Sequence, residues 1–196
     1  MVATQPNSFL TPEQYLEIER KADFKSEYYD GKMFAMAGAN FRHNVLVANL
    51  IGELRQALRP RGCRILPSDM RVRVSVTGLY TYPDVIAVCG EPELGGDEFD
   101  VLLNPGLIVE VLSPSTEAYD RGRKFEQYRA LESLRAYLMV SADRVHVELY
   151  TRRPDREWKL SEASDLSETI DICTLECKVP LSGIYEGIEI SKPDLR

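Results

Sequence analysis

The sequence predicts an α+β fold, in which a mixed central β-sheet is flanked by helices and preceded by an N-terminal helix and a β-hairpin. Two short apolar runs rich in β-branched residues, 85–88 and 107–112, are typical of buried central strands. Apolar residues recur at helical spacing over about 42–58, before these runs, and a second helix is expected over 119–134. In a chain of 196 residues this order predicts one domain (1–196) with its core at about 42–151.

The N-terminal region, 11–36, carries local signals for a helix and a hairpin. Thr11-Pro12-Glu13-Gln14 combines a hydroxyl cap, a proline at the first helical position and a glutamine three residues after the cap, which predicts a helix to about Lys21. Asp30-Gly31 lies between the apolar stretches 24–29 and 32–36, a strong hairpin signal. Glu27 is expected on the first strand of this hairpin.

The core region is predicted to alternate between helices and strands. Pro60 and Gly62 end the helix over 42–58. The alternation over 64–76 then predicts one half-exposed strand with Arg71 and Arg73 on its solvent side. Further strands are expected at 80–88, 107–112, 136–140 and 145–151. From Pro154 the chain becomes an acidic, irregular extension (154–196), with edge strands expected at 170–173, 175–179 and 184–190.

Composition excludes several classes of protein. Hydrophobic residues make up 44% of the chain and charged residues 28%, as in soluble globular proteins. No signal peptide is recognised and no apolar run approaches the ~20 residues of a membrane span, so a cytoplasmic protein without a membrane partner is expected. The net charge of −7 argues against chain-wide attraction to nucleic acid. The segment 55–73 nevertheless holds six arginines and one acid, Asp69, for which a salt bridge is expected.

The four cysteines are Cys63, Cys89, Cys173 and Cys177. In a chain of this length they do not predict a disulfide framework. Cys173 and Cys177 are spaced like a weak metal clip, but a closed zinc site would need more cysteine or histidine ligands. Buried, apolar-like cysteines are therefore expected.

Two acids interrupt the central apolar runs. Asp84 opens the first, and Glu110 lies inside the second. A carboxylate in a buried strand is costly unless it is paired, hydrogen-bonded or bound to a cation. Two carboxylates on neighbouring strands can hold one Mg²⁺ ion, which neutralises phosphoryl oxygens and activates water. Such a pair of acids has the chemistry that metal-dependent phosphodiester hydrolysis needs.

This combination resembles the PD-(D/E)xK nuclease superfamily, and more closely its Uma-two-type restriction-endonuclease-like family. Pro83-Asp84 and Glu110 match the two acids, and the predicted order of elements over 42–140 matches the family core. The resemblance also rests on Tyr82-Pro83-Asp84-Val85, on Glu110-Val111-Leu112-Ser113-Pro114-Ser115, on Asp120, Lys124 and Tyr128, on the Glu27 hairpin and on His43. It implies an endonuclease that cuts DNA with Mg²⁺ or Mn²⁺ bound by Asp84 and Glu110, and that forms a homodimer.

One position departs from the superfamily pattern. The lysine expected two residues after the second acid is replaced by Leu112, and the resemblance transfers its role to Lys124. Asp120, Lys124 and Tyr128 are four residues apart and form one row on a helix. In the same reading Glu27 and His43 support the site. The clustered arginines Arg64, Arg71 and Arg73 suit a surface that contacts phosphates.

Structural interpretations compete with each of these roles. Pro83-Asp84 can be a turn that starts a strand, and Lys124 a surface lysine paired with Asp120. His43 can belong to a helix cap, and Glu27 to a solvated hairpin. The alternative function is therefore a catalytically inactive nucleic-acid-binding or interaction protein of the same fold. A small-molecule hydrolase ranks last, because no nucleophile elbow or metal-histidine motif supports it.

Overall fold

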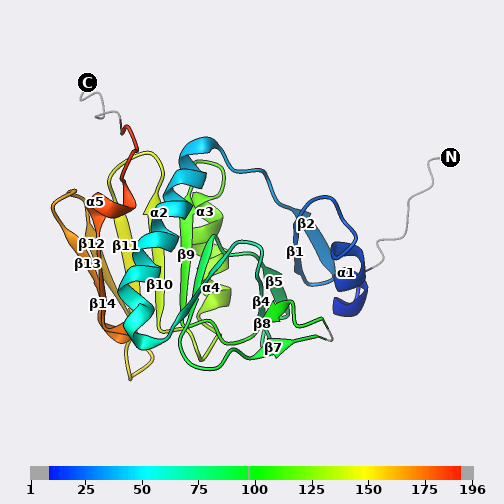
Figure 1. Cartoon of the computed structure of the whole chain (residues 1–196). Helices are drawn as coiled ribbons and strands as arrows, with labels where there is room; N and C mark the ends of the chain where they lie inside the picture. The colour runs from blue at the N-terminus through cyan, green and yellow to red at the C-terminus, as the bar shows by residue number, and fades with distance from the viewer. Residues whose placement is uncertain (1–8, 97, 191–196) are drawn as a thin grey trace.

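The computed structural model describes residues 9–96 and 98–190, and a mixed six-stranded sheet forms its centre (Figure 1). The strand order in this main sheet is β12-β11-β10-β9-β6-β3. Its strands are β3 (Arg64–Pro67), β6 (Val85–Val88), β9 (Leu107–Leu112), β10 (Ala136–Ser141), β11 (Val147–Arg152) and β12 (Trp158–Ala163). Strands β9 and β10 are parallel, and the other neighbours are antiparallel. The predicted α+β class and the central position of 85–88 and 107–112 are confirmed.

The two faces of the main sheet face different hydrophobic cores. Helix α2 (Phe41–Leu58) covers one face with a stripe of fully buried leucines four residues apart: Leu46, Leu50, Leu54 and Leu58. The other face is covered by a helical segment composed of α3 (Glu117–Tyr119), the π-helical turn η2 (Asp120–Lys124) and α4 (Phe125–Tyr128). The rings of Phe125 and Tyr128 pack there against Tyr137 of β10.

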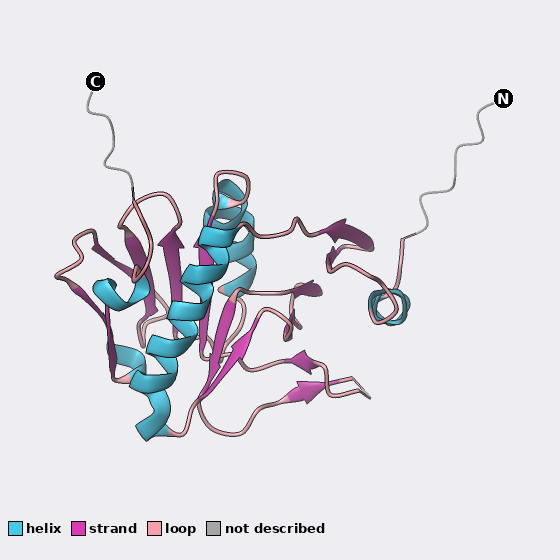
Figure 2. Cartoon of the chain, turned by 45° about the horizontal axis from the view of Figure 1, so that its top comes forward, coloured by secondary structure: helices cyan, strands magenta, loops and turns pink. Residues whose placement is uncertain are grey.

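A second, smaller sheet has the order β2-β1-β5-β4-β8-β7. Its strands are β1 (Ser26–Tyr29), β2 (Lys32–Ala35), β4 (Arg71–Val74), β5 (Leu79–Thr81), β7 (Leu94–Gly95) and β8 (Val101–Leu102). Helix α1 (Pro12–Glu19) packs on it through Tyr15, which contacts the rings of Tyr28 and Tyr80. Figure 2 shows α1 and the β1–β2 hairpin at the end of the molecule away from the main sheet. The predicted N-terminal helix, its Thr11 capping box and the hairpin are confirmed.

Two predicted strands are in fact two strands each. The stretch 64–76 divides into β3 and β4, and 80–88 divides into β5 and β6, with one part of each in either sheet. A turn closed by the hydrogen bond from Met70 N–H to Pro67 O causes the first break. Pro83, which has no N–H to donate, lies in the second break. The prediction of one continuous strand was wrong in both places.

The predictions for the second helix and the C-terminal region need correction. The α-helical turns end at Tyr128, not at 134, after the π-helical turn. The region from Pro154 to residue 190 is regular: besides β12 it contains β13 (Thr169–Ile172), β14 (Cys177–Pro180) and α5 (Leu181–Ile184). These elements pack on the same core as α2. Strands β13 and β14 confirm the strands expected at 170–173 and 175–179, whereas the strand expected at 184–190 does not form. The last part of the predicted extension, 191–196, lies outside the described residues. Short 3-10 turns occupy η1 (Arg59–Arg61) and η3 (Cys173–Leu175).

The cysteine prediction was wrong for three of the four residues. Cys63 and Cys89 form a disulfide, and Cys173 is exposed, while Cys177 is buried as expected. The disulfide lies one residue beyond the pair Arg64 and Val88, so it joins the ends of β3 and β6. In the described parts of the chain, no helix is both long enough and apolar enough to cross a membrane.

Candidate active site

Asp84 directly precedes β6, and Glu110 lies within the neighbouring strand β9. Strands β6 and β9 pair Val85 with Val109 and Ile86 with Ile108. Asp84 lies in a bend one residue before β6, and extending this antiparallel register by one position would place it across from Glu110. Side chains at opposite positions have Cβ atoms about 4.5–5.5 Å apart. The register therefore brings both acids to one place.

Asp84 is held by two donors on the same oxygen. The backbone N–H of Val111 donates to Oδ2 at 2.8 Å, and Nε2 of His43 lies 3.1 Å from it. His43 is in the first turn of α2, where Asn40 caps its N–H. Burial works to lower the pKa of His43, but the hydrogen bond and the charge of Asp84 outweigh burial and raise it. His43 therefore orients Asp84 through this contact.

Glu110 is enclosed by the helical segment. Its side chain is 4% exposed, and the Tyr128 hydroxyl donates to Oε1 at 2.8 Å. Nζ of Lys124 lies 2.9 Å from the same oxygen. Burial raises the pKa of Glu110 well above its ordinary value, the charges of Asp120 and Asp84 add to this, and Lys124 opposes it. A second positive charge at this place would favour the ionised form of Glu110.

Lys124 is buried among acids rather than exposed. Its amine lies 3.3 Å from Glu27 and 3.5 Å from Asp120, in addition to Glu110. Burial opposes the charged form, but Glu110, Glu27 and Asp120 together raise the pKa of Lys124 well above its ordinary value. Burial likewise raises the pKa of Asp120. The cluster holds more carboxylates than cations, so it favours a bound cation.

Glu27 reaches this cluster from the second sheet. The pair Tyr28 and Tyr80 sets Glu27 opposite Thr81, whose hydroxyl donates to Glu27 Oε1. The Tyr119 hydroxyl donates to the other oxygen at 2.9 Å. The sequence interpretation did not include Thr81 or Tyr119. The sequence offered only the strand alternation around Thr81 as a signal. The contact of Thr81 with Glu27 depends on the pairing of β5 with β1, which the sequence does not show.

The predicted phosphate-binding arginines do not join the acids. Arg64 is exposed at the start of β3, opposite Val88 and therefore at the far end of β6 from Asp84. Arg71 is 5% exposed and contacts the Tyr82 hydroxyl and Asp100, so the expectation that it faces solvent was wrong. Its enclosure leaves no surface for a phosphate.

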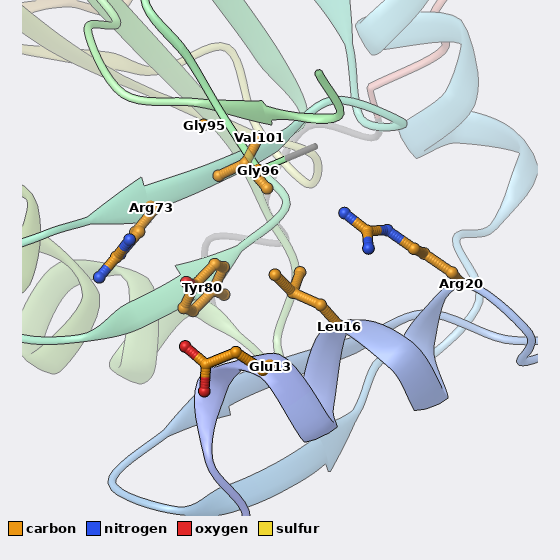
Figure 3. A pocket seen from close by; sticks show the side chains of 8 residues that line it. All are labelled: Glu13, Leu16, Arg20, Arg73, Tyr80, Gly95, Gly96 and Val101. Carbon is orange, nitrogen blue, oxygen red and sulfur yellow. The ribbon is translucent and has the colours of Figure 1, made fainter. Parts of the chain in front are cut away.

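Arg73 lines a cavity of about 250 Å³ between α1 and the second sheet (Figure 3). The other lining residues are Glu13, Leu16, Arg20, Tyr80, Gly95, Gly96 and Val101. The Arg73 guanidinium lies over the Tyr80 ring, 5.4 Å from its centroid. None of the acids around Lys124 lines this cavity.

Asp84 and Glu110 each keep one carboxylate oxygen that could bind a divalent cation. Among the described residues, the hydrogen bonds and ion pairs of Asp84 use Oδ2 and those of Glu110 use Oε1. Oδ1 of Asp84 and Oε2 of Glu110 are thus left for an ion, and Mg²⁺ takes few protein ligands and keeps several waters. A separate group of potential metal ligands, His146, Glu148 and Glu162, lies elsewhere on the main sheet.

The fold and the acid–lysine cluster define a class, the α+β proteins with a restriction-endonuclease-like fold. Residues 12–180 match the model of the family described as "Uma2: Putative restriction endonuclease". The chain belongs to the Uma2 family.

Related proteins span nearly the whole chain. Two proteins of Synechocystis sp. (strain ATCC 27184 / PCC 6803 / Kazusa) match: "Uncharacterized protein slr1290" is 35% identical over 191 residues, covering 96% of this chain and 99% of the relative. "Uncharacterized protein sll1609" is 36% identical over 162 residues, which cover 83% of this chain and 92% of the relative. A crystal structure from Anabaena variabilis ATCC 29413, described as "a putative nuclease belonging to DUF820", superposes with a TM-score of 0.72. It covers 90% of this chain and 97% of its own at 14% identity, and so supports the fold.

Proposed function

We propose that this protein is an endonuclease that hydrolyses phosphodiester bonds of DNA with a divalent metal ion, Mg²⁺ or Mn²⁺, held by Asp84 and Glu110. The observation that carries the proposal is the Lys124 amine 2.9 Å from Glu110 of β9, with Asp84 at the start of the neighbouring strand β6. Membership of a family described as restriction endonucleases supports the reaction class.

Each neighbouring residue has a positioning task in this proposal. His43 and the Val111 N–H fix Asp84, and Tyr128 fixes Glu110, so that the remaining oxygen of each carboxylate faces the ion. The bound ion would neutralise phosphoryl charge and lower the pKa of a water. Lys124, kept charged by Glu27 and Asp120, would orient that water or stabilise the charge that develops on the phosphoryl oxygens. Leu112 cannot supply this charge, so Lys124 replaces the usual lysine.

Plasmid nicking tests the proposal. Wild-type protein is expected to nick supercoiled DNA only with Mg²⁺ or Mn²⁺, whereas Asp84→Ala and Glu110→Ala should lose cleavage because the ion has lost a ligand. Lys124→Met should keep metal binding, measured by calorimetry, and lose cleavage. Arg123→Met is the matched control, since this neighbouring cation is exposed and should leave cleavage unchanged. Cleavage that persists in both acid variants, or without metal, contradicts the proposal.

The same experiment decides between an enzyme and an inactive binding protein. The inactive binding protein is supported by the three carboxylates that already pair with the Lys124 amine, because these ion pairs can serve structure alone. The inactive binding protein would be favoured by two results together: the chain binds DNA without cutting it in the presence of any divalent ion, and Asp84→Ala leaves its metal affinity unchanged. Arg64 and Arg73 are the proposed phosphate contacts. Their replacement should weaken binding and reduce its dependence on salt. A homodimer, proposed from the family resemblance, is tested by the sedimentation of the purified chain.

A further inference from the structure

We propose that His146, Glu148 and Glu162 form a second metal site, which takes Zn²⁺ and is separate from the candidate active site. Strand geometry brings the three residues together. His146 precedes β11 and is two residues from Glu148, so both side chains leave the same face of the strand. Glu162 of β12 is the cross-strand partner of Glu148. All three side chains therefore converge on one patch of the main sheet.

The distances between the three side chains are close to those of neighbouring ligands around one ion. Nε2 of His146 lies 3.0 Å from Oε1 of Glu148 and 3.5 Å from Oε1 of Glu162. One ligand atom from each of the three residues lies within 4.8 Å of the ligand atoms of the other two. Zinc bonds to nitrogen and oxygen are about 2.0–2.2 Å long, so tetrahedral ligands lie roughly 3.3–3.5 Å apart. Only small side-chain movements are needed to admit the ion.

Residues around the group hold the ligands in place. The other ring nitrogen of His146, Nδ1, lies 3.0 Å from the Ser164 hydroxyl. Ser164 follows Ala163, the cross-strand partner of Val147, and so lies across from His146. Arg121 binds the second oxygen of Glu148. Metal-binding histidines usually have such a partner on the second nitrogen, which fixes the ring and leaves the first nitrogen for the ion. His146 and Glu148 have side chains 13% and 8% exposed, whereas Glu162 is 53% exposed and leaves a path for entry.

Charge and ligand chemistry favour zinc. Two carboxylates face one imidazole, and the nearby Arg121 also pairs with Glu117, so its charge is shared. A divalent ion would neutralise the remaining negative charge. One imidazole nitrogen with two carboxylate oxygens suits Zn²⁺ better than Mg²⁺ or Ca²⁺, which prefer oxygen ligands alone. Water would complete the coordination on the exposed side.

The second site lies on the same face as Glu110 but not in contact with it. The register across the sheet runs from Glu110 to Met139 and then to Glu148. Two strand spacings of about 4.8 Å therefore separate Glu110 from Glu148. The ligands of the two sites are different residues, and zinc binding can be tested whether or not the protein cuts DNA.

Zinc titration of the tag-free chain tests the inference. The Asp84→Ala variant removes the first candidate site, and calorimetry should still detect one Zn²⁺ per chain. His146→Ala and Glu162→Gln in that background should weaken Zn²⁺ binding by about 100-fold or more. Ser164→Ala should weaken it by about 10-fold, as expected for a residue that orients a ligand. Glu157→Gln, an exposed acid beside β12, is the matched control and should bind Zn²⁺ normally.

Imidazole NMR signals give an independent readout, because the chain contains two histidines. In the Asp84→Ala variant, Zn²⁺ should shift the signals of His146 and leave those of His43 unchanged. Glu162→Gln keeps the test decisive should His146→Ala fail to fold, since Glu162 is exposed. Equal Zn²⁺ affinity with and without Glu162, or an unshifted His146 in excess Zn²⁺, would mean that the group is only a set of ion pairs and would overturn the inference.

Discussion

The Tyr128 hydroxyl, together with the Lys124 amine, connects the helical segment with Glu110, the buried acid of β9. The hydroxyl donates to Glu110 at 2.8 Å, and Tyr128 is fully buried. Tyr128→Phe removes this donor from a buried acceptor, which costs about 1–3 kcal/mol. We expect the free energy of unfolding, measured in urea, to fall by about that amount.

Tyr150→Phe serves as the control for Tyr128. The Tyr150 ring packs on Phe125, and its hydroxyl has no hydrogen bond among the described residues. This variant should unfold with nearly the wild-type free energy. Equal losses in the two variants would show that the Tyr128 hydroxyl does not stabilise the acid cluster.

At the scale of single residues, the sequence was informative wherever a polar side chain interrupted an apolar run. Asp84 and Glu110 were recognisable because an acid in a buried strand needs a partner. Arg71 was misassigned because strand alternation also fits an arginine buried against Tyr82 and Asp100. Burial of a charged side chain depends on partners that are distant in sequence, and a local pattern does not contain them.

At the scale of elements, the π-helical turn explains why the second helix was predicted only in part. Apolar spacing predicts a regular helix, but the wider turn at Asp120–Lys124 buries both of those residues. A π turn holds one more residue than an α turn, and such turns often occur at functional sites. Its position depends on the contacts of Lys124 with Glu27 and Glu110, which come from two different sheets.

Gly122 in this turn is a site for stabilisation. Its backbone is not in the left-handed region, and an added Cβ would meet no atom within 4 Å. Gly122→Ala should therefore raise the free energy of unfolding by about 0.4–1 kcal/mol, because alanine restricts the unfolded chain. Gly62→Ala is the matched control: it also has open space, but its φ of +68° should make the substitution destabilising. Melting temperatures that change in the same direction would contradict this account.

Asp100 links α1 to β4 and gives the molecule an acid-sensitive contact. Arg20 donates to it at 2.9 and 3.0 Å and Arg71 at 3.0 Å, and chiefly the Arg20 hydrogen bonds lower the pKa of Asp100 from 3.8 to about 2. A lowered pKa in the folded state stabilises the fold above pH 3.8, and this contribution is lost as the pH falls toward 2.

Asp100→Asn should consequently lower stability near neutral pH by no more than about 1 kcal/mol, because the carboxylate is partly exposed. The difference from wild type should shrink as the pH is lowered through this window. Urea unfolding at several pH values measures it. A difference that stays constant down to the acid end would argue against the ion pair as the source of stability.

At the scale of the whole molecule, strand order depends on contacts that are far apart in the sequence. The order of elements predicted the α+β class and the central strands, since hydrophobic periodicity is a local property. The division of 64–76 and 80–88 between two sheets was not predictable, because each half looks like a strand by itself. Strands at 170–173 and 175–179 were expected, but their packing on the α2 core was missed, because the acidic composition indicated an exposed extension and α2 is distant in the sequence.

The Cys63–Cys89 disulfide acts at this same scale, because it fixes the edge strand β3 to β6 over a separation of 26 residues. A cross-link that closes a loop of this length reduces the entropy of the unfolded chain and is worth about 3 kcal/mol. The double variant Cys63→Ala/Cys89→Ala should therefore melt about 6–12 °C below wild type. Dithiothreitol should lower the melting temperature of wild type to the level of the double variant and leave the double variant unchanged. Cys173→Ala, which removes an exposed free thiol, is the control and should melt as wild type does. A wild-type melting temperature that does not respond to dithiothreitol would mean that the two thiols are reduced in solution, and the strand pairing of β3 and β6 would then hold this edge of the sheet without a covalent link.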